Sequence, residues 1–319
     1  QARGLTRVGI SQSALGNAPI PHPQFAEQNA IADFLDHETA KIDALIEEQQ
    51  RLIDLLEEKR QAVISHAVTK GLDPGAPMKD SGVEWLGEVP AHWRIAPVSY
   101  CIDIQEGPGI LAEDFRDQGV PLVRISGLEG DWVTLQGCNY LDPDKVAAKW
   151  SHFRLKEGDL LISASASMGA VNEVGEETSG AVPYTGLIRL NPVPGIAAKE
   201  FIKAFVKSDE FKTQVNLLKA GSTIQHFGPT HLKQMKIALP PIAEQRKISE
   251  HIALLEDQYS RLIRAAEEGK QLLAERRSAL ISAAVTGKID VRNWQSRADS
   301  AEELPIAAEE PATYEASEP

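Results

Sequence analysis

The sequence has little cysteine, few aromatic residues and no long apolar run. Only two of its 319 residues are cysteine, Cys101 and Cys138, which is too few for a disulfide framework and is typical of proteins in a reducing cytoplasm. We therefore expect a cytoplasmic location. The chain has no run of about 18 apolar residues and no basic-then-apolar leader, so we expect no membrane association. Aromatic residues make up 6% of the chain, in keeping with a large helical share.

Patterns that mark several enzyme classes are also missing. The chain has no GxxxxGK[ST] loop, which gives no support to P-loop ATP hydrolysis, and no glycine-rich turn suited to a nucleotide cofactor. Asn191-Pro192 is followed by Val-Pro, not by the proline-aromatic pair of an amino-methyltransferase site. His226 and His231 lie five residues apart, but no third metal ligand neighbours them. We therefore expect no catalytic residues, no metal and no cofactor.

Acidic residues outnumber basic ones, but the charge is unevenly distributed. The formal net charge is −13, and residues 296–319 hold seven acids and one base. With little to bury, this segment predicts a disordered acidic tail at 293–319. Residues 199–236 reverse the balance, with seven lysines and three acids. Such an excess of lysine fits either an ordinary solvated surface or contact with an anionic partner.

An internal repeat organises the chain. Residues 20–73 and 237–290 align without a gap at an offset of 217, with 19 identities in 54 positions. A repeat of this length indicates a duplicated structural element. The register also extends backwards, because Gly4, Thr6 and Leu15 align with Gly221, Thr223 and Leu232. Residues 3–19 therefore match the end of the segment that precedes residue 237. They look like the end of a first copy of that domain.

Each repeat is predicted to form one long helix. Apolar residues recur at heptad spacing, which indicates a coiled coil. In the first copy the predicted seam comprises Leu35, Ile42, Leu56 and Val63, with Leu45 and Leu52 at the companion core position. In the second copy it comprises Ile252, Tyr259, Leu273 and Leu280, with Leu255 and Leu262. The helices should begin after Pro23 and Pro241 and end near Gly71 and Gly287.

The segment between the helices is predicted to be an α/β domain. Residues 120–128, 158–166 and 186–192 are β-rich runs bounded by turn residues, and residues 197–221 have helical apolar spacing up to Gly221. Because domain termini commonly lie close together, the two helices should pair in antiparallel fashion. The expected fold is α+β, with an α/β domain attached to a long antiparallel two-helix coiled coil.

Four stretches of the sequence carry a family resemblance. They are DSGVEWLGEVPAHWRIAPV at 80–98, KEGDLLISASASMGAV at 156–171, GSTIQHFGPTHLKQMKIALPPIAEQRKI at 221–248, and the pair of helical repeats. Together, from residue 3 to about residue 292, they resemble the specificity subunit of type I restriction-modification systems. The first and third stretches are specific in combination.

The resemblance implies a non-catalytic subunit that selects a DNA sequence for partner enzymes in DNA methylation and antiviral defence. Its expected partners are double-stranded DNA, methyltransferase (modification) subunits that clamp the helices, and a restriction subunit with motor and nuclease. The implied organisation has a target-recognition domain at 79–237 between conserved helices at 23–73 and 238–292.

The chain departs from the family pattern at its beginning. It starts with Gln1 rather than Met, and most of a first recognition domain is not represented. We expect residues 1–22 to be a remnant of that domain. A second copy of the chain is then a further candidate partner.

Three groups of residues are candidates for contact with DNA. Lysines suit phosphate contacts, and polar side chains on loops or strand ends suit the edges of bases. The candidates are Lys203 and Lys207 on the lysine-rich helix, Ser222, Thr223, Gln225 and His226 after a helix-stopping glycine, and Arg124 and Ser126 at a strand end. The ordinary alternatives are a solvated helix face, a hydrogen-bonded turn and a surface strand.

Two other classes of function stay open. One is a coiled-coil scaffold whose middle domain binds protein, which salt-dependent DNA binding would distinguish. The other is the recognition subunit of a related nuclease-methyltransferase fusion system.

Overall fold

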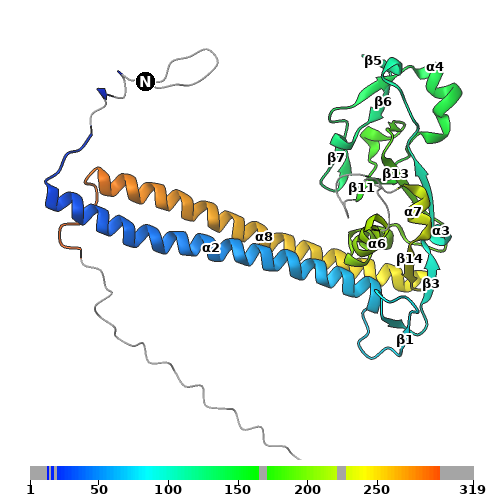
Figure 1. Ribbon diagram of the computed structural model, residues 1–319, viewed down its shortest axis with the longest axis horizontal. Helices are drawn as coiled ribbons and strands as arrows, with labels where there is room; N and C mark the ends of the chain where they lie inside the picture. Colours follow the sequence, from blue (N-terminus) through cyan, green and yellow to red (C-terminus); the bar gives the residue numbers. More distant parts are fainter. Residues whose placement is uncertain (1–12, 14–15, 18–19, 165–170, 221–227, 295–319) are drawn as a thin grey trace, which may run out of the picture. The chain divides into compact units, whose positions relative to one another are not determined.

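The computed structural model describes residues 13, 16–17, 20–164, 171–220 and 228–294. Two compact units make up the chain: the first comprises residues 1–52 and 265–319, and the second comprises residues 53–264. The long helices α2 (Phe25–Lys70) and α8 (Ile242–Val285) contribute to both units (Figure 1). No described helix is long and apolar enough to cross a membrane.

The two long helices are antiparallel, as predicted. In the first unit, Arg277 Nε donates to Asp43 Oδ1 at 2.7 Å, and Lys270 Nζ donates to Gln50 Oε1 at 2.6 Å. In the second unit, His251 of α8 lines one cavity together with α2 residues 59–67. Rising residue numbers in α2 therefore meet falling numbers in α8 within each unit.

The helix ends also lie where the prolines and glycines predict them. Gly71 follows the last residue of α2 with a φ of 77°, and Gly287 follows α8 with a φ of 73°, the left-handed conformation that commonly ends a helix. At the N-terminal ends of α2 and α8, the same hydrogen bond occurs once in each repeat. Gln28 Nε2 donates to the carbonyl of Pro23 at 2.8 Å, and Gln245 Nε2 donates to that of Pro240 at 2.9 Å.

The buried seam of the helices differs from the sequence prediction at the companion core position. In α2, Ile53 is 6% exposed, whereas Leu45 and Leu52 are 51% and 44% exposed. In α8, Ile263 is 8% exposed and Leu262 is 53% exposed. At the pairs Leu52-Ile53 and Leu262-Ile263 the companion position therefore lies one residue later than predicted, at the isoleucine. Leu255, by contrast, is half-buried as predicted. Heptad spacing alone does not decide which of two adjacent apolar residues faces the neighbouring helix.

Between the long helices, short strands and helices form the α/β body of the second unit. The strands are β1 (Met78–Asp80), β2 (Glu88–Pro90), β3 (Arg94–Pro97), β4 (Ile102–Glu106), β5 (Phe115–Arg116), β6 (Val120–Val123), β7 (Leu128–Glu129), β8 (Trp132–Val133), β9 (Asn139–Leu141), β10 (Leu160–Ser163), β11 (Val171–Glu173), β12 (Val182–Pro183), β13 (Leu187–Pro192) and β14 (Lys236–Leu239). The helices are α3 (Val98–Cys101), α4 (Pro143–Lys145), α5 (Lys199–Lys207), α6 (Asp209–Ala220) and α7 (Pro229–Gln234), with the short 3-10 helices η1 (Ala112–Asp114), η2 (Ile125–Gly127), η4 (Ser151–Phe153) and η5 (Glu176–Thr178) and the π-helix η3 (Val146–Trp150).

Two mixed sheets dominate this body. One has the strand order β4-β13-β10-β11-β8-β7 and the other β12-β6-β9-β5. In each sheet one pair is parallel, β11 with β8 and β12 with β6, and the remaining described pairs are antiparallel. Each predicted β-rich run contains a strand, β6, β10 or β13.

A single hydrophobic core joins the α/β body to the helix segments of the second unit. Val68 of α2 and Ile248 of α8 are 2% and 0% exposed, and they belong to the same buried cluster as Phe201 and Phe211. Gln245 adds a polar link, because its side chain accepts from the Ala198 amide and donates to the Ile196 carbonyl, both at 2.8 Å. The body and these helix segments therefore fold as one structural element.

The predicted helix at 197–221 is in fact two helices, α5 and α6, separated at Ser208. This residue is extended, with φ −69° and ψ 159°. Its hydroxyl donates to the Phe205 carbonyl at 2.8 Å and accepts from the Phe211 amide at 3.3 Å. One side chain thus satisfies the end of the first helix and caps the start of the second. Continuous apolar spacing across the break concealed it.

Candidate functional site

Strand pairing in the smaller sheet gathers polar residues around Arg124. Arg124 follows β6 directly, and Ser126 lies in the turn η2. Antiparallel β9 places Asn139 opposite Leu122. Parallel β12 ends beside β6, so the Tyr184 amide donates to the Val123 carbonyl at 3.0 Å. Three chain segments that are distant in sequence therefore meet at one strand end.

The guanidinium group of Arg124 is held on two sides. Nη1 donates to Asn139 Oδ1 at 2.8 Å, and the guanidinium carbon lies 4.1 Å from the centroid of the Tyr184 ring. Phe115 adds a second ring at 5.8 Å. Stacking on an aromatic face and a hydrogen bond together fix the plane of an arginine. The remaining N–H donors of this arginine are then pre-oriented for a ligand.

A cavity of about 330 Å³ lies beside this arginine. It is lined by Arg124, Ile125, Ser126, Gly137, Asn139, Tyr184 and Thr185. Because Ser126 Oγ donates to Gln136 and Thr185 Oγ1 donates to Pro108, both hydroxyl oxygens remain acceptors. Gly137 keeps one side open, since a Cβ there would lie 2.6 Å from Ser126 Oγ. Among the described residues that line the cavity, none is a carboxylate and Arg124 is the one charged side chain.

This arrangement suits a planar ligand edge that carries hydrogen-bond acceptors. An arginine with a fixed plane offers paired N–H donors, the geometry that matches two adjacent acceptors. The O6 and N7 atoms of guanine present such a pair. Among the described residues no group of three His, Cys, Asp or Glu side chains that could hold a metal ion occurs. The side chains that line the cavity offer hydrogen bonds and the positive charge of Arg124.

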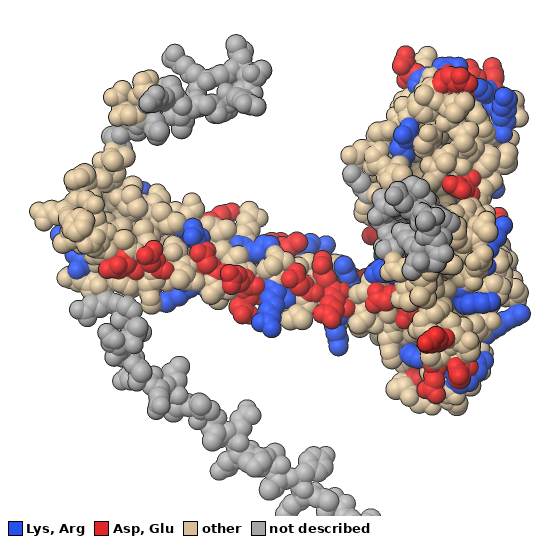
Figure 2. Space-filling view, viewed as in Figure 1, with Lys and Arg blue, Asp and Glu red and all other residues tan. Residues whose placement is uncertain are grey.

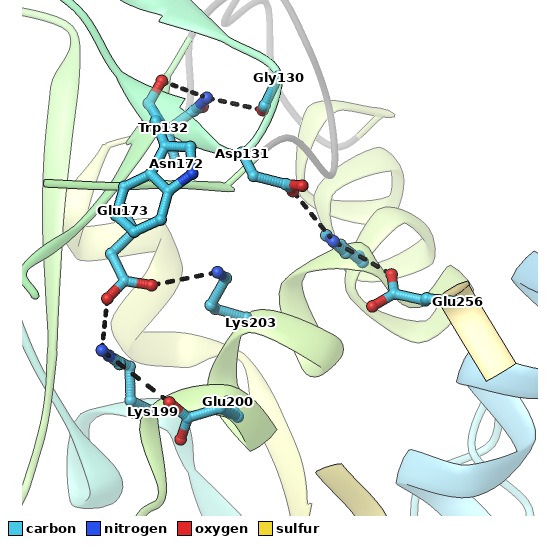
Figure 3. Close-up of polar contacts among 10 residues, drawn as sticks. Gly130, Asp131, Trp132, Asn172, Glu173, Lys199, Glu200, Lys203 and Glu256 are labelled. Carbon is cyan, nitrogen blue, oxygen red and sulfur yellow. Dashed lines mark hydrogen bonds and ion pairs between the residues drawn. The ribbon is translucent and has the colours of Figure 1, made fainter. Parts of the chain in front are cut away.

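The two predicted phosphate-binding lysines each lie in an ion-pair network of the second unit, and Figure 3 shows Lys203 beside Glu173. Lys203 Nζ is 3.2 Å from Glu173 Oε2, and Lys199 pairs with the same carboxylate. Lys207 Nζ is 3.1 Å from Glu256 of α8 and 3.5 Å from Asp131. Much of the positive charge of this helix face is therefore neutralised within the protein. The phosphate role of Lys203 and Lys207 stays a prediction, and the network adds a link between α5 and α8.

The acidity of Glu173 reflects this network. Burial, the largest influence, raises the pKa of Glu173, but the hydrogen bonds and charges of Lys199 and Lys203 together outweigh it and hold the pKa below its ordinary value. A carboxylate with a lowered pKa stabilises the fold above its unfolded-state pKa and loses that contribution as the pH falls through the folded-state pKa. The network is therefore intact at neutral pH.

The remaining predicted contacts, Ser222, Thr223, Gln225 and His226, lie outside the described residues. Conversely, Asn139, Tyr184 and Thr185 complete the cavity around Arg124 and Ser126 but were not predicted. Nothing local in the sequence marks them, because only the pairing of β6 with β9 and β12 brings them to Arg124.

Comparison with known proteins establishes the family. A family model described as the type I restriction modification DNA specificity domain matches residues 101–267. That range is 167 of the 319 residues, more than half of the chain. The chain therefore belongs to this family, as the sequence resemblance predicted.

Individual relatives agree. The type I restriction enzyme MjaVIII specificity subunit of Methanocaldococcus jannaschii is 23% identical over 300 residues, which are 92% of this chain and 67% of that protein. The EcoKI specificity subunit of Escherichia coli is 24% identical over 221 residues, which are 66% of this chain and 46% of that protein. The chain thus spans between about half and two thirds of these relatives' lengths.

Solved structures support the same fold. A structure described for complex assembly and conformational transition of the type I R-M system has a TM-score of 0.68 at 19% identity, covering 91% of this chain and 66% of that one. The HsdS subunit of Thermoanaerobacter tengcongensis has a TM-score of 0.51 at 20% identity, covering 90% and 65%. The predicted fold, an α/β body attached to two long paired helices, is confirmed.

Proposed function

We propose that this chain is a sequence-specific DNA-recognition subunit that directs methyltransferase and restriction subunits to their target. Residues 79–237 act as the target-recognition domain in this proposal. The observation that carries it is the geometry of Arg124, whose guanidinium is fixed by Asn139 and Tyr184 at the edge of a polar cavity. This cavity lies within the segment that matches the specificity-domain model.

A fixed arginine gives sequence preference because its binding partner must match its geometry. Arginine that donates two hydrogen bonds to guanine is the commonest specific contact in the major groove, and each such pair contributes about 1–3 kcal/mol of discrimination. A flexible surface arginine would instead bind phosphates of any sequence. The hydrogen bond to Asn139 and the stacking on Tyr184 therefore favour base reading at Arg124.

Replacing Arg124 with alanine should lower methylation at the cognate sequence about 5- to 150-fold, the range that corresponds to about 1–3 kcal/mol. The measurement is methyl transfer to cognate and non-cognate DNA by the chain assembled with its modification subunits. On this proposal the chain alone transfers no methyl group and hydrolyses neither ATP nor DNA. The same assay on the chain without modification subunits therefore gives the background level of methyl transfer.

Arg94→Ala is the matched control for this experiment. Arg94 is also an arginine of the second unit stacked on a tyrosine, Tyr100, with 4.3 Å between the guanidinium carbon and the ring centroid. It does not line the cavity. Equal losses in the two variants, or a loss at Arg124 that is the same for every DNA sequence, would contradict base reading.

The outer faces of the helices supply surfaces for partner subunits in this proposal. Leu45 and Leu262 occupy equivalent repeat positions and are 51% and 53% exposed. Leu55 and Leu272 form a second equivalent pair, with 54% and 64% exposed. Figure 2 shows acidic and basic side chains interspersed along these helices. Single exposed leucines are common on protein surfaces, but these recur at the same positions of both repeats. Repetition of the same leucines favours two equivalent docking sites.

A second comparison within the repeat concerns the surface that holds the α/β body. Residues that are buried against the body in the second unit have identical counterparts in the first unit that are more exposed. Val68 is 2% exposed and Val285 is 44% exposed. Further such pairs, buried member first, include Ile64 and Ile281, Ser65 and Ser282, Thr69 and Thr286, Gln245 and Gln28, and Ile248 and Ile31. The first unit thus repeats a surface that fits a domain of the same kind.

If the chain acts as it stands, we expect two copies in each complex and an inverted-repeat DNA target. Two copies related by a two-fold axis present two recognition domains in opposite orientations, which favours a palindromic site. The surface of Val285, Ser282 and Gln28 is one place where a second copy would bind. Mass measurement of the assembled complex, together with sequencing of its methylated sites, tests both parts. One copy per complex with a single asymmetric half-site would reject the pairing.

A further inference from the structure

A second cavity of the second unit, of about 430 Å³, is rich in positive charge. One wall is the turn η4 with the residues that follow it, and the other walls come from β13 and from the loop before β12. Its polar lining consists of Ser151, His152, Arg154, Lys156, Ser179, Arg189 and Asn191, together with the backbone of Gly180.

Arg189 holds the walls of this cavity together. Its Nη1 donates to the Arg154 carbonyl at 3.0 Å, and its Nη2 donates to the His152 carbonyl at 3.5 Å. Its ion pair with Asp159 measures 3.3 Å, and the two side chains are 11% and 10% exposed. Nε of Arg189 is buried and has no hydrogen-bond partner within the described part of the chain. Arg189 therefore neutralises Asp159 and retains one donor without a partner.

Arg154 and Lys156 contribute positive charge that no carboxylate within the described part of the chain pairs with. Both side chains are exposed, and neither forms an ion pair with a described residue. Two acids lie nearby: Glu157 is adjacent in sequence, and Asp103 lies across the sheet from Asn191. Neither acid forms an ion pair with Arg154 or Lys156. Lys203 and Lys207 differ in this respect, because their charges meet carboxylates within the protein.

We propose that this cavity binds a phosphate group of the DNA backbone, an inference that rests on the DNA-recognition function proposed above. The cavity presents guanidinium, ammonium, hydroxyl and amide groups, all of which can donate hydrogen bonds. A phosphodiester presents acceptors and a negative charge, which suits this set of donors. Contacts of this kind fix the position of a protein on DNA without reading its sequence.

Strand β13 connects this cavity to the Arg124 cavity, because Arg189 and Asn191 of β13 line the one and Tyr184, just before β13, lines the other. The Leu187 amide, at the start of β13, donates to the Tyr184 carbonyl at 3.0 Å. Asn191 follows four residues later, roughly 13 Å along an extended strand. Each DNA strand carries one phosphate per about 3.4 Å of helix axis. A duplex whose bases contact Arg124 therefore has several phosphates within a comparable length of its axis.

The test removes the two unpaired cations with Arg154→Ala/Lys156→Ala. Each phosphate contact contributes about 0.9 to the slope of log affinity against log salt concentration, so losing the one contact proposed here should make the slope of the assembled complex shallower by about 0.9. Affinity should fall equally for cognate and non-cognate DNA, and the methylated sequence should stay the same. Arg246→Ala/Lys247→Ala, which removes two exposed cations from α8, is the matched control and should leave the slope unchanged.

Two further measurements separate the possible outcomes. Ser179→Asp places a carboxylate at the cavity wall and should also weaken DNA binding, which covers the case that the double variant misfolds. Binding of inorganic phosphate in the absence of DNA, together with a wild-type salt slope in both variants, would identify a free anion as the ligand. A wild-type salt slope in both variants overturns the proposal, whether or not inorganic phosphate binds. Failure of the recognition function itself would look different, because the unmodified complex would then methylate without sequence preference.

Discussion

Replacing Leu45 and Leu262 with glutamate is expected to prevent assembly with the modification subunits while the chain stays folded. Both side chains are about half exposed, so the substitutions remove little from the core. A buried hot-spot residue at a protein interface typically contributes 2 kcal/mol or more, about 30-fold in affinity. Placing a charge at two equivalent contacts should therefore reduce association by roughly 30-fold at each site. The measurement is co-purification and a binding isotherm with the modification subunit.

Leu254→Glu is the control for this prediction. Leu254 is 65% exposed on α8, but its repeat counterpart is His37, so it does not belong to the shared leucine pairs. We expect this variant to assemble normally. Methylation should fall with assembly in the Leu45 and Leu262 double variant, because recruitment of the enzyme is lost. Normal assembly of the double variant would show that partners bind elsewhere.

Much of the helical architecture was predictable because its signals are local. Prolines and glycines mark the helix ends, and the repeat with its offset of 217 identifies the second helix from the first. The antiparallel pairing follows from connectivity. The exact seam was not predictable, since Leu52 and Ile53 are adjacent apolar residues and only packing shows that Ile53 is buried. The break at Ser208 was likewise hidden, because apolar spacing continues on both sides.

The candidate site was predictable only in part, since its residues meet through long-range strand pairing. Arg124 stands out as a basic residue at a strand end. Asn139 and Tyr184 reach it through β9 and β12, and neither pairing leaves a local pattern in the sequence. The ion pairs of Lys203 and Lys207 depend in the same way on residues as distant as Glu173 and Glu256. A local excess of lysine in the sequence therefore does not indicate how much positive charge is left unpaired and can bind DNA.

Exchanging residues 79–237 for the equivalent segment of a relative with another target is expected to change the methylated sequence completely. In the proposed function this segment holds the base-reading residues, whereas the repeated helices hold the partner surfaces. The structure sets one condition on the exchange. Val68 and Ile248 pack into the same core as Phe201 and Phe211, so the donor segment must bring apolar residues of similar volume to this face, because core cavities cost about 2–5 kcal/mol.

The most direct test of the account is to sequence the methylated sites made by this exchanged chain with the original modification subunits. The account predicts that the donor's recognition sequence becomes methylated, that the original sequence does not, and that the modification subunits still co-purify with the chain. Methylation of the original sequence by the exchanged chain would contradict the claim that residues 79–237 read the DNA.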